Sequence, residues 1–354
     1  MRIMTVTDAW HPQINGVVRT TERLLERLDA WGNETSLIEP SQFSTFPLPS
    51  YPDIRLSLPR PGTVALRIAQ ADPDHVHIVT EGPLGLAARR VCLAQGRVFT
   101  TSYHTRFPEY LRTRVAFPVS WSYACLRRFH NAGTGTFVST PSLASELRGR
   151  GFTKVRAWTR GVDTALFDPA HAGDLDLPRP IFLYVGRVAV EKDLPAFLDL
   201  DLPGTKLVVG DGPSLSALKA RYPQVVFLGS RTGTELARLY ASSDVFVFPS
   251  RTDTFGIVLL EALASGLPVA AYPVTGPADV LADGQGGVLS HDLREAALAA
   301  LRIPRAACRQ KALGYDWDQC ARMFLDLVKT AYARDLQPDA ASFPFRTAGR
   351  RPAL

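Results

Sequence analysis

Short apolar runs typical of β-strands alternate with amphipathic, helix-forming stretches along most of the chain. In the first half the apolar runs are RIMTVT, HVHIVT and RVFTTSY, and helix-like segments follow the first two. A second series contains the runs IFLYVG, KLVVG, VVFLG, DVFVFPS and PVAAY, again with helix-like segments between them. Strands that alternate with helices of this length predict parallel sheets built from βαβ units. We therefore expect an α/β fold of two doubly wound, Rossmann-like domains that face each other across a cleft.

The boundary between the two series lies in a stretch dense in proline and glycine, which is typical of a linker. We predict an N-terminal domain over residues 1–165, a linker over 166–178 and a C-terminal domain over 179–330. Residues 331–354 are rich in proline, alanine and arginine, and we expect them to form a flexible tail without fixed structure.

Composition narrows the class of protein. The 354 residues are 46% hydrophobic, which suits two buried cores, and no run approaches the roughly eighteen apolar residues that span a bilayer. The opening MRIMTVTDAW lacks the apolar core of a signal peptide, and the four cysteines are far apart in the sequence. Both features favour a reducing cytoplasm over a disulfide framework or a zinc site. The net charge of +6 fits an anionic partner: a nucleotide, a phospholipid surface or a nucleic acid.

The stretch SRTDTFGIVLLEALASGLPVAAY places two acids, Asp253 and Glu261, eight residues apart. Asp253 follows a predicted strand, and ligands of an open parallel sheet bind beyond the carboxyl ends of its strands. By position it is either a helix N-cap or a ligand-binding acid, beside a helix N-terminus suited to a phosphate. Glu261 has apolar neighbours on nearly every side, so we expect a buried carboxylate that must meet a donor. The two hydroxyls of a ribose would supply such donors.

These residues resemble those of a family 4 retaining glycosyltransferase of the GT-B fold. The two acids match the Glu-x7-Glu motif of that family, with Asp253 in place of the first glutamate. Further matching segments extend to about residue 330: Asn15–Val17, Ser102–Tyr110, Arg160–Asp163, Gly186–Asp193 and Gly210–Pro213. The resemblance implies that a nucleotide sugar is the donor and that the C-terminal domain binds most of it.

The resemblance also implies a role for individual residues. Arg187 and Lys192, on a loop after a strand, would stabilise the departing diphosphate, whereas ordinary surface charges are the alternative. Gly16 would let its loop approach the phosphates, with an ordinary turn glycine as the equal alternative. The catalytic residues implied are His104, Arg187, Lys192 and Asp253. The donor-binding residues implied are Gly16, Val17, Arg187, Lys192, Gly229, Asp253, Phe255, Gly256, Ile257, Val258 and Glu261.

No metal and no cofactor are expected at this site. The family is thought to react on one face of the sugar, with the departing phosphate oxygen taking the acceptor proton, so that the protein supplies positioning and charge stabilisation. Two Asp-x-Asp pairs, Asp174/Asp176 and Asp199/Asp201, have the pattern by which other glycosyltransferases hold manganese. The first lies in the predicted linker and the second ends a predicted helix, so we interpret both as chance.

The segment Glu109–Asn131 suggests an acceptor. It mixes arginines and aromatic residues, namely Arg112, Arg114, Arg127 and Arg128 with Phe117, Trp121, Tyr123 and Phe129. That composition is typical of a segment at an anionic membrane surface, and a packed internal helix is the equal alternative. Together with WTRGVDTALFDP, it resembles the branch of glycosyl- and sulfoquinovosyl-diacylglycerol synthases and GDP-mannose-dependent α-mannosyltransferases. We therefore expect a hexosyl transfer from a UDP-hexose, a UDP-hexuronate or GDP-mannose to a lipid, diacylglycerol or a glycolipid, by an enzyme peripheral on the inner face of the cytoplasmic membrane.

Four other functions are alternatives, and two of them are disfavoured. An α-mannosyltransferase could use a soluble or polysaccharide acceptor, and a nucleotide-sugar epimerase could have the same fold without needing the basic aromatic segment. An NAD-dependent oxidoreductase is disfavoured because no strand-linked GxGxxG with a following acid occurs. Nucleic-acid binding is disfavoured because the basic residues are dispersed among acids.

Overall fold

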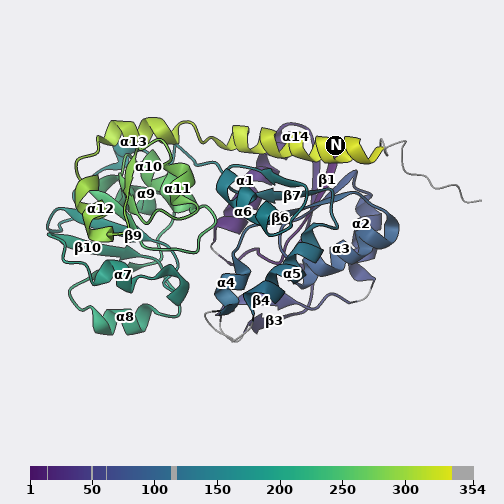
Figure 1. Ribbon diagram of the computed structural model, residues 1–354, viewed down its shortest axis with the longest axis horizontal. Coiled ribbons are helices and arrows are strands. Elements are labelled where there is room, and N and C mark those ends of the chain that lie inside the picture. The colour runs from purple at the N-terminus through teal and green to yellow at the C-terminus, as the bar shows by residue number, and fades with distance from the viewer. Residues whose placement is uncertain (14, 49–50, 61, 113–117, 337–354) are drawn as a thin grey trace, which may run out of the picture.

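A computed structural model describes residues 1–13, 15–48, 51–60, 62–112 and 118–336. It contains two parallel six-stranded sheets, each flanked by helices, and Figure 1 shows them side by side as separate domains. The sequence-based prediction of two doubly wound domains is confirmed.

The first sheet has the strand order β2-β1-β5-β6-β7-β8, with every pair parallel. Its strands are β1 (Arg2–Val6), β2 (Glu34–Ile38), β5 (His75–Ile78), β6 (Phe99–Tyr103), β7 (Gly135–Val138) and β8 (Val155–Ala157). The helices of this half are α1 (Gly16–Ala30), α2 (Thr63–Ala71), α3 (Pro83–Gln95), α4 (Phe107–Arg112), α5 (Val119–His130) and α6 (Pro141–Gly149), with a short 3-10 helix η1 (Pro40–Gln42). A separate antiparallel hairpin pairs β3 (Thr45–Leu48) with β4 (Tyr51–Ser57).

The second sheet has the order β11-β10-β9-β12-β13-β14 and is also entirely parallel. Its strands are β9 (Ile181–Val185), β10 (Thr205–Val209), β11 (Val226–Gly229), β12 (Val245–Phe248), β13 (Val269–Ala271) and β14 (Gly287–Leu289). Its helices are α7 (Pro195–Leu198), α8 (Leu215–Arg221), α9 (Gly233–Ser242), α10 (Ile257–Ala264), α11 (Pro277–Val280), α12 (Leu293–Ala300) and α13 (Arg305–Ala312). The 3-10 helices η2 (Pro169–His171) and η3 (Val190–Lys192) and the long helix α14 (Trp317–Leu336) complete the chain.

The strand order places a crevice at one defined point of the second sheet. The chain moves outward from β9 through β10 to β11, then returns to the other side of β9 with β12. Loops leaving β9 and β12 therefore diverge to opposite faces and leave a gap at the carboxyl ends of these strands, where such folds bind ligands. The loop after β9 carries Arg187 and Lys192, and the loop after β12 carries Asp253.

The central strands are buried on both faces, which explains their continuous apolar sequences. All five residues of β9 and all four of β12 are buried, as expected for a parallel sheet covered by helices on each side. Two apolar clusters, one on each face, form the core of this domain. Within the described ranges, no helix is both long and apolar enough to cross a membrane.

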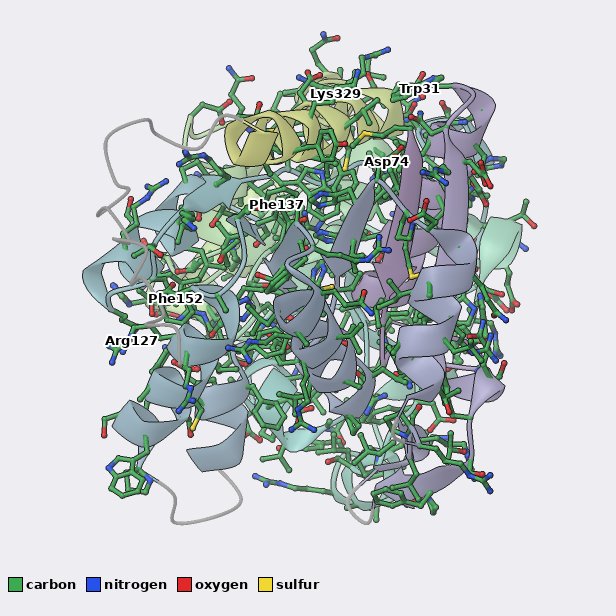
Figure 2. The ribbon with its side chains drawn as sticks, turned by 90° about the vertical axis from the view of Figure 1, so that its right-hand side faces the viewer. Trp31, Asp74, Arg127, Phe137, Phe152 and Lys329 are labelled. Atoms are coloured by element: carbon green, nitrogen blue, oxygen red, sulfur yellow. The ribbon has the colours of Figure 1, made fainter. Side chains whose placement is uncertain are left out.

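Helix α14 returns to the first domain, which the predicted boundaries did not include. The predicted C-terminal domain extended to residue 330, but the apolar face of α14 packs against β1, α1 and β7 of the N-terminal domain. Figures 1 and 2 show this helix lying across that domain, with Phe137 beneath it. The helix continues to Leu336, beyond the predicted start of the tail, and residues 337–354 lie outside the described residues.

The start of the predicted linker also belongs to a core. Val162 and Phe167 are buried in the apolar cluster of the C-terminal domain. The backbone N–H of Val162 donates to the carbonyl of Tyr315, so the two chain crossings between the domains lie beside each other. The predicted domain limits stay a prediction. The structure adds that the two segments in which the chain crosses between the domains lie beside each other.

We predict that Phe324→Ala destabilises the N-terminal domain by about 3–5 kcal/mol, the usual cost of emptying a packed aromatic site. The Phe324 ring is fully buried, and its centroid lies 4.8 Å from that of His77 and 5.1 Å from that of Trp158. Met323→Ala, which changes an exposed neighbour on the same helix, is the control. Urea unfolding followed by tryptophan fluorescence measures both, and equal midpoints for the two variants would contradict a structural role of α14.

Candidate active site

The carboxyl ends of both sheets face each other, and hydrogen bonds across this boundary join the two domains. The hydroxyl of Ser139, after β7, donates to the carbonyl of Thr254 at 2.7 Å. The hydroxyl of Thr254 donates to the carbonyl of His104, after β6, at 2.6 Å. Arg106 donates to the Thr275 hydroxyl at 2.9 Å. The loop that carries Asp253 is therefore held against the N-terminal domain from two sides.

Helix α10 begins immediately after this loop, as the sequence predicts. Gly256 precedes its first residue with a φ of 84°, a left-handed conformation that favours glycine. An added Cβ at this position would also lie 3.1 Å from the Phe248 ring. Among the described residues, the backbone N–H groups of Phe255, Gly256 and Ile257 have no acceptor. This end of the helix can therefore donate to an anionic or hydroxylated ligand.

Asp253 is not the N-cap of α10, because Gly256 occupies that position. Its Oδ1 instead accepts from the ammonium of Lys192 at 2.5 Å, across the crevice between β9 and β12. Both side chains are less than one-fifth exposed. Its Oδ2 is buried and accepts from no described residue, so this oxygen is available to a ligand hydroxyl. The sequence analysis treated the two residues separately, and the structure joins them.

Arg187 and Gly229 lie at the carboxyl ends of β9 and β11 of the second sheet, which β10 separates. Arg187 follows β9 and is half-buried, and its carbonyl accepts from the Tyr184 hydroxyl at 2.9 Å. Gly229 ends β11, and its carbonyl accepts from the N–H of Gly210 at 2.9 Å. Gly210 explains part of the GDGP segment, because a Cβ there would lie 1.8 Å from the carbonyl oxygen of Gly186. The loops after β9 and β10 can pack this closely only without a side chain at residue 210.

Glu261 is 2% exposed, and the structure supplies its donors from the protein itself. Its Oε2 accepts from the Tyr240 hydroxyl at 3.0 Å, and its Oε1 is bonded to the guanidinium of Arg19. Burial raises the pKa of this carboxyl, and the Arg19 charge and the Tyr240 hydrogen bond oppose that rise. The buried carboxylate therefore meets donors within the protein, and the ribose as a further donor stays a prediction. Its oxygens keep lone pairs with which a ribose could still bond.

Arg19 is the site residue that the sequence analysis missed. It lies one helical turn after Gly16 on α1, so both residues lie on the face that meets the other domain. Asn15 starts the helix by accepting from the N–H groups of Val17 and Val18, each at 3.0 Å. An added Cβ on Gly16 would lie 3.3 Å from Ile257 of α10. The signal in the sequence was the position of Arg19, two residues after the NGV segment.

His104 is half-buried at the end of β6. Its Nδ1 lies 3.2 Å from the guanidinium of Arg160, which is itself 3% exposed. Burial and then the Arg160 charge hold the pKa of His104 well below its usual value, so the imidazole is neutral. Through the Thr254 bond to its carbonyl, His104 lies next to the loop of Asp253.

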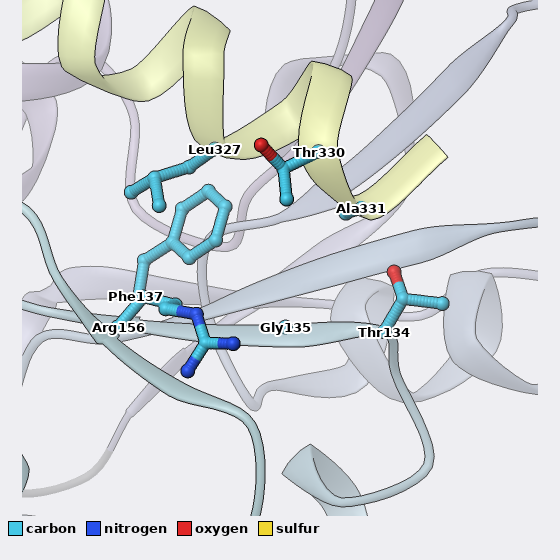
Figure 3. Close-up of a pocket in the computed structure, with 7 residues that line it drawn as sticks. All are labelled: Thr134, Gly135, Phe137, Arg156, Leu327, Thr330 and Ala331. Carbon is cyan, nitrogen blue, oxygen red and sulfur yellow. The ribbon is translucent and has the colours of Figure 1, made fainter. Parts of the chain in front are cut away.

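A cavity of about 260 Å³ lies between the domains, on the side of this loop where the chain crosses from one domain to the other. Hydroxyl-bearing, acidic and apolar side chains line it: Ser139, Thr140, Pro141, Ala157, Thr159, Phe255, Asp279, Val280, Tyr315 and Met323. A second cavity, of about 20 Å³, lies under α14 and holds at most a water molecule (Figure 3). Its residues Thr134 and Gly135 are at the start of β7, so it lies at the opposite end of the sheet from the candidate site.

Two family models match the chain, one on each domain. A model described as Glycosyltransferase Family 4 matches residues 14–166, and one described as Glycosyl transferases group 1 matches residues 179–303.

Relatives and a solved structure agree with these models. A GDP-mannose-dependent alpha-mannosyltransferase of Mycobacterium tuberculosis is 30% identical over 90% of this chain and 93% of its own length. An alpha-monoglucosyldiacylglycerol synthase of Streptococcus pneumoniae is 28% identical over 85% and 78%, respectively. The solved structure of a sucrose-phosphate synthase from Thermosynechococcus elongatus shares the fold, with a TM-score of 0.73 and 20% identity over 94% of this chain and 99% of that one. The chain therefore belongs to glycosyltransferase family 4, the retaining hexosyltransferases of the GT-B fold that transfer a sugar from a nucleotide sugar.

Proposed function

We propose that this enzyme transfers a hexosyl unit, with mannose from GDP-mannose as the first candidate, to a lipid acceptor at a membrane surface. The observation that carries the proposal is the division of charge between the two domains. Residues 1–165 carry 20 basic and 13 acidic side chains, whereas residues 166–354 carry 20 and 21. The whole positive excess of the chain therefore lies on the domain that faces the acceptor, and not on the domain that binds the donor.

The donor would lie in the crevice between β9 and β12. Arg187 and Lys192 would meet the diphosphate, and the free N–H groups at the start of α10 would add donors to its oxygens. Glu261 would accept from the ribose, and the free Oδ2 of Asp253 from a sugar hydroxyl. The GDP-mannose dependence of the mycobacterial relative, which matches along nearly the whole chain, supports that donor over UDP-linked hexoses.

Retention would follow from reaction on one face of the sugar. The bond from the anomeric carbon to the phosphate oxygen breaks as the acceptor oxygen forms its bond on the same face. The acceptor proton passes to the departing phosphate oxygen, and the two electrons of the broken bond leave with the nucleoside diphosphate. Fixed cations, of which Lys192 is held by Asp253, stabilise the developing charge without needing a metal ion.

The surface of helices α4 and α5 supports a lipid acceptor. Trp121 is 68% exposed and Phe107 51% exposed, while Arg127 and Arg128 are exposed on α5. Figure 2 shows Arg127 at the periphery of the domain. Exposed aromatic rings beside arginines suit an anionic bilayer interface. The relative named as a glucosyldiacylglycerol synthase fits the same class of acceptor.

Part of the predicted basic aromatic segment does not lie on this surface. Tyr123 and Phe129 are buried in the domain, so they are core residues and not lipid contacts. Arg114, Phe117 and the side chain of Arg112 lie outside the described residues.

A panel of nucleotide sugars tests the proposed reaction. We expect GDP-mannose to raise the midpoint of thermal unfolding more than UDP-sugars do, because a bound donor stabilises the folded state by mass action. Mannosyl transfer to diacylglycerol or a glycolipid in vesicles should then persist in excess EDTA. Conversion of the donor alone to an epimer would favour the epimerase alternative, and transfer only to soluble sugars would favour the soluble-acceptor alternative. Loss of activity in EDTA that manganese restores would contradict the metal-independent mechanism.

We predict that Lys192→Ala lowers kcat on the order of a hundredfold with a smaller change in donor KM, because the developing charge is greatest in the transition state. Asp253→Asn should also lower kcat. The double variant should show a smaller fold-loss in kcat than the product of the two single fold-losses, because the residues act as a pair. Lys219→Ala, on the exposed face of α8, is the control. A raised KM with unchanged kcat would contradict the role of Lys192.

We predict that Arg127→Glu with Arg128→Glu weakens binding to anionic vesicles by an order of magnitude or more, since each basic residue near such a surface contributes about 1 kcal/mol. The control is Lys219→Glu with Arg221→Glu, which makes the same change of charge on α8 of the other domain. Added salt should reproduce the first effect through screening. Vesicle binding equal to that of the unmodified protein would contradict the membrane surface and favour a soluble acceptor.

A further inference from the structure

Arg160 is a buried cation that pairs with no described carboxylate. One nitrogen of its guanidinium donates to the carbonyls of Trp158 at 2.6 Å and Thr159 at 3.0 Å, and the other lies 3.2 Å from Nδ1 of His104. The guanidinium also stacks 4.4 Å from the centre of the Trp158 ring. Burial lowers the pKa of Arg160 to about 10, which leaves it charged at neutral pH. A buried charge without a counter-ion is costly, so a purely structural role explains this arginine poorly.

The hydrogen bond between Arg160 and His104 has only one possible direction. A guanidinium carries donors and no acceptor, and that of Arg160 is charged at neutral pH. Nδ1 of His104 must therefore accept with its lone pair, and the single proton of the neutral ring must be on Nε2. A doubly protonated ring would place one N–H against another.

We propose that Arg160 is a positioning residue that locks His104 in its neutral, Nε2-protonated form, so that His104 donates one hydrogen bond to the transferred sugar. This inference rests on the proposed function and on the resemblance that implies His104 as a catalytic residue of the site. Locked in this way, the ring cannot take a proton from the acceptor through Nε2, and it cannot become a cationic acid.

The surroundings of His104 agree with a fixed donor. Within the described part of the chain, nothing accepts from its Nε2. Its carbonyl is bonded to Thr254, the residue directly after Asp253. The donor of His104 and the free acceptor oxygen of Asp253 therefore belong to segments that contact each other. A sugar hydroxyl both donates and accepts, and can use both groups.

The charged and titratable groups near the ring all oppose its protonation. Besides Arg160, they are His77 on β5 and His130 on α5, and both lower the pKa of His104 after burial and Arg160. Among these groups Arg160 alone bonds directly to the ring. Removal of Arg160 should therefore free Nδ1 and raise the pKa of His104, although burial, the largest cause, continues to lower it.

The first test is the position of the proton, measured by ¹⁵N NMR of histidine-labelled protein, with His104→Gln used to assign the signal. We expect a neutral ring protonated at Nε2 in the unmodified protein and a mixture of the Nδ1-protonated and Nε2-protonated forms in Arg160→Met. Arg156→Met, the same substitution on β8 beside the cavity of Figure 3, is the control and should leave the His104 signal unchanged. A proton on Nδ1 in the unmodified protein would overturn the inference. This readout needs no substrate, so it stands even if the proposed donor or acceptor is wrong.

The second test is the pH dependence of kcat/KM. Between pH 8 and 5.5, Arg160→Met should lose more activity than the unmodified enzyme, because the pKa of His104 rises when the Arg160 charge is removed, and the burial that remains should keep this loss below about tenfold. Arg160→Lys keeps a positive charge in case the methionine variant folds poorly, and should show a smaller loss. In a His104→Gln background, Arg160→Met should add no further pH dependence. Parallel pH profiles with and without Arg160 would overturn the proposal.

Discussion

The burial of Glu261 at the boundary between the domains is the constraint on which the site depends. A carboxylate removed from water is strongly destabilising unless donors replace the water. Tyr240 supplies one donor from the same domain, and Arg19 supplies the other from the opposite domain. Separating the domains would leave Glu261 with half of its partners. Contact between the two domains therefore completes the set of donors around Glu261.

The other contacts across the boundary fix the position of one domain relative to the other. Thr254 is bonded through its hydroxyl to His104 and through its carbonyl to Ser139, so a single residue aligns the loop after β12 with two strands of the first sheet. On the hinge side, α14 packs its apolar face on the N-terminal domain and reduces the freedom of the crossing chain. Group transfer benefits from such alignment, because small displacements of the reacting groups cost large factors in rate.

The side chains around the candidate sugar site have partners that fix their charge. Lys192 is held by Asp253, and His104 is kept neutral beside Arg160. A site arranged in this way offers fixed cations, one free carboxylate oxygen and one fixed donor. That set suits a transfer in which the leaving phosphate takes the acceptor proton, because the protein then needs to stabilise charge and not to move protons.

Much of this architecture could be predicted from the sequence. The apolar runs predicted β1, β5 and β6 of the first sheet and β9 to β13 of the second, since local conformational preferences are encoded in neighbouring residues. The order of the strand-end segments also indicated where Arg187, Lys192 and Asp253 would lie, because the carboxyl ends of parallel strands share one edge.

The partners of these residues were decided by the tertiary structure alone. Arg19 and Glu261 are 242 positions apart, and Arg160 and His104 are 56 apart. No periodicity links such pairs, because their contact depends on how two sheets dock and not on any local pattern. For the same reason the sequence showed that Glu261 must be buried but could not show which donor it meets. The sequence by itself thus determined the elements and the edge on which the site lies, and only the docking of the two domains decided which charges are paired, because a buried charge takes its partner from whatever surface closes over it.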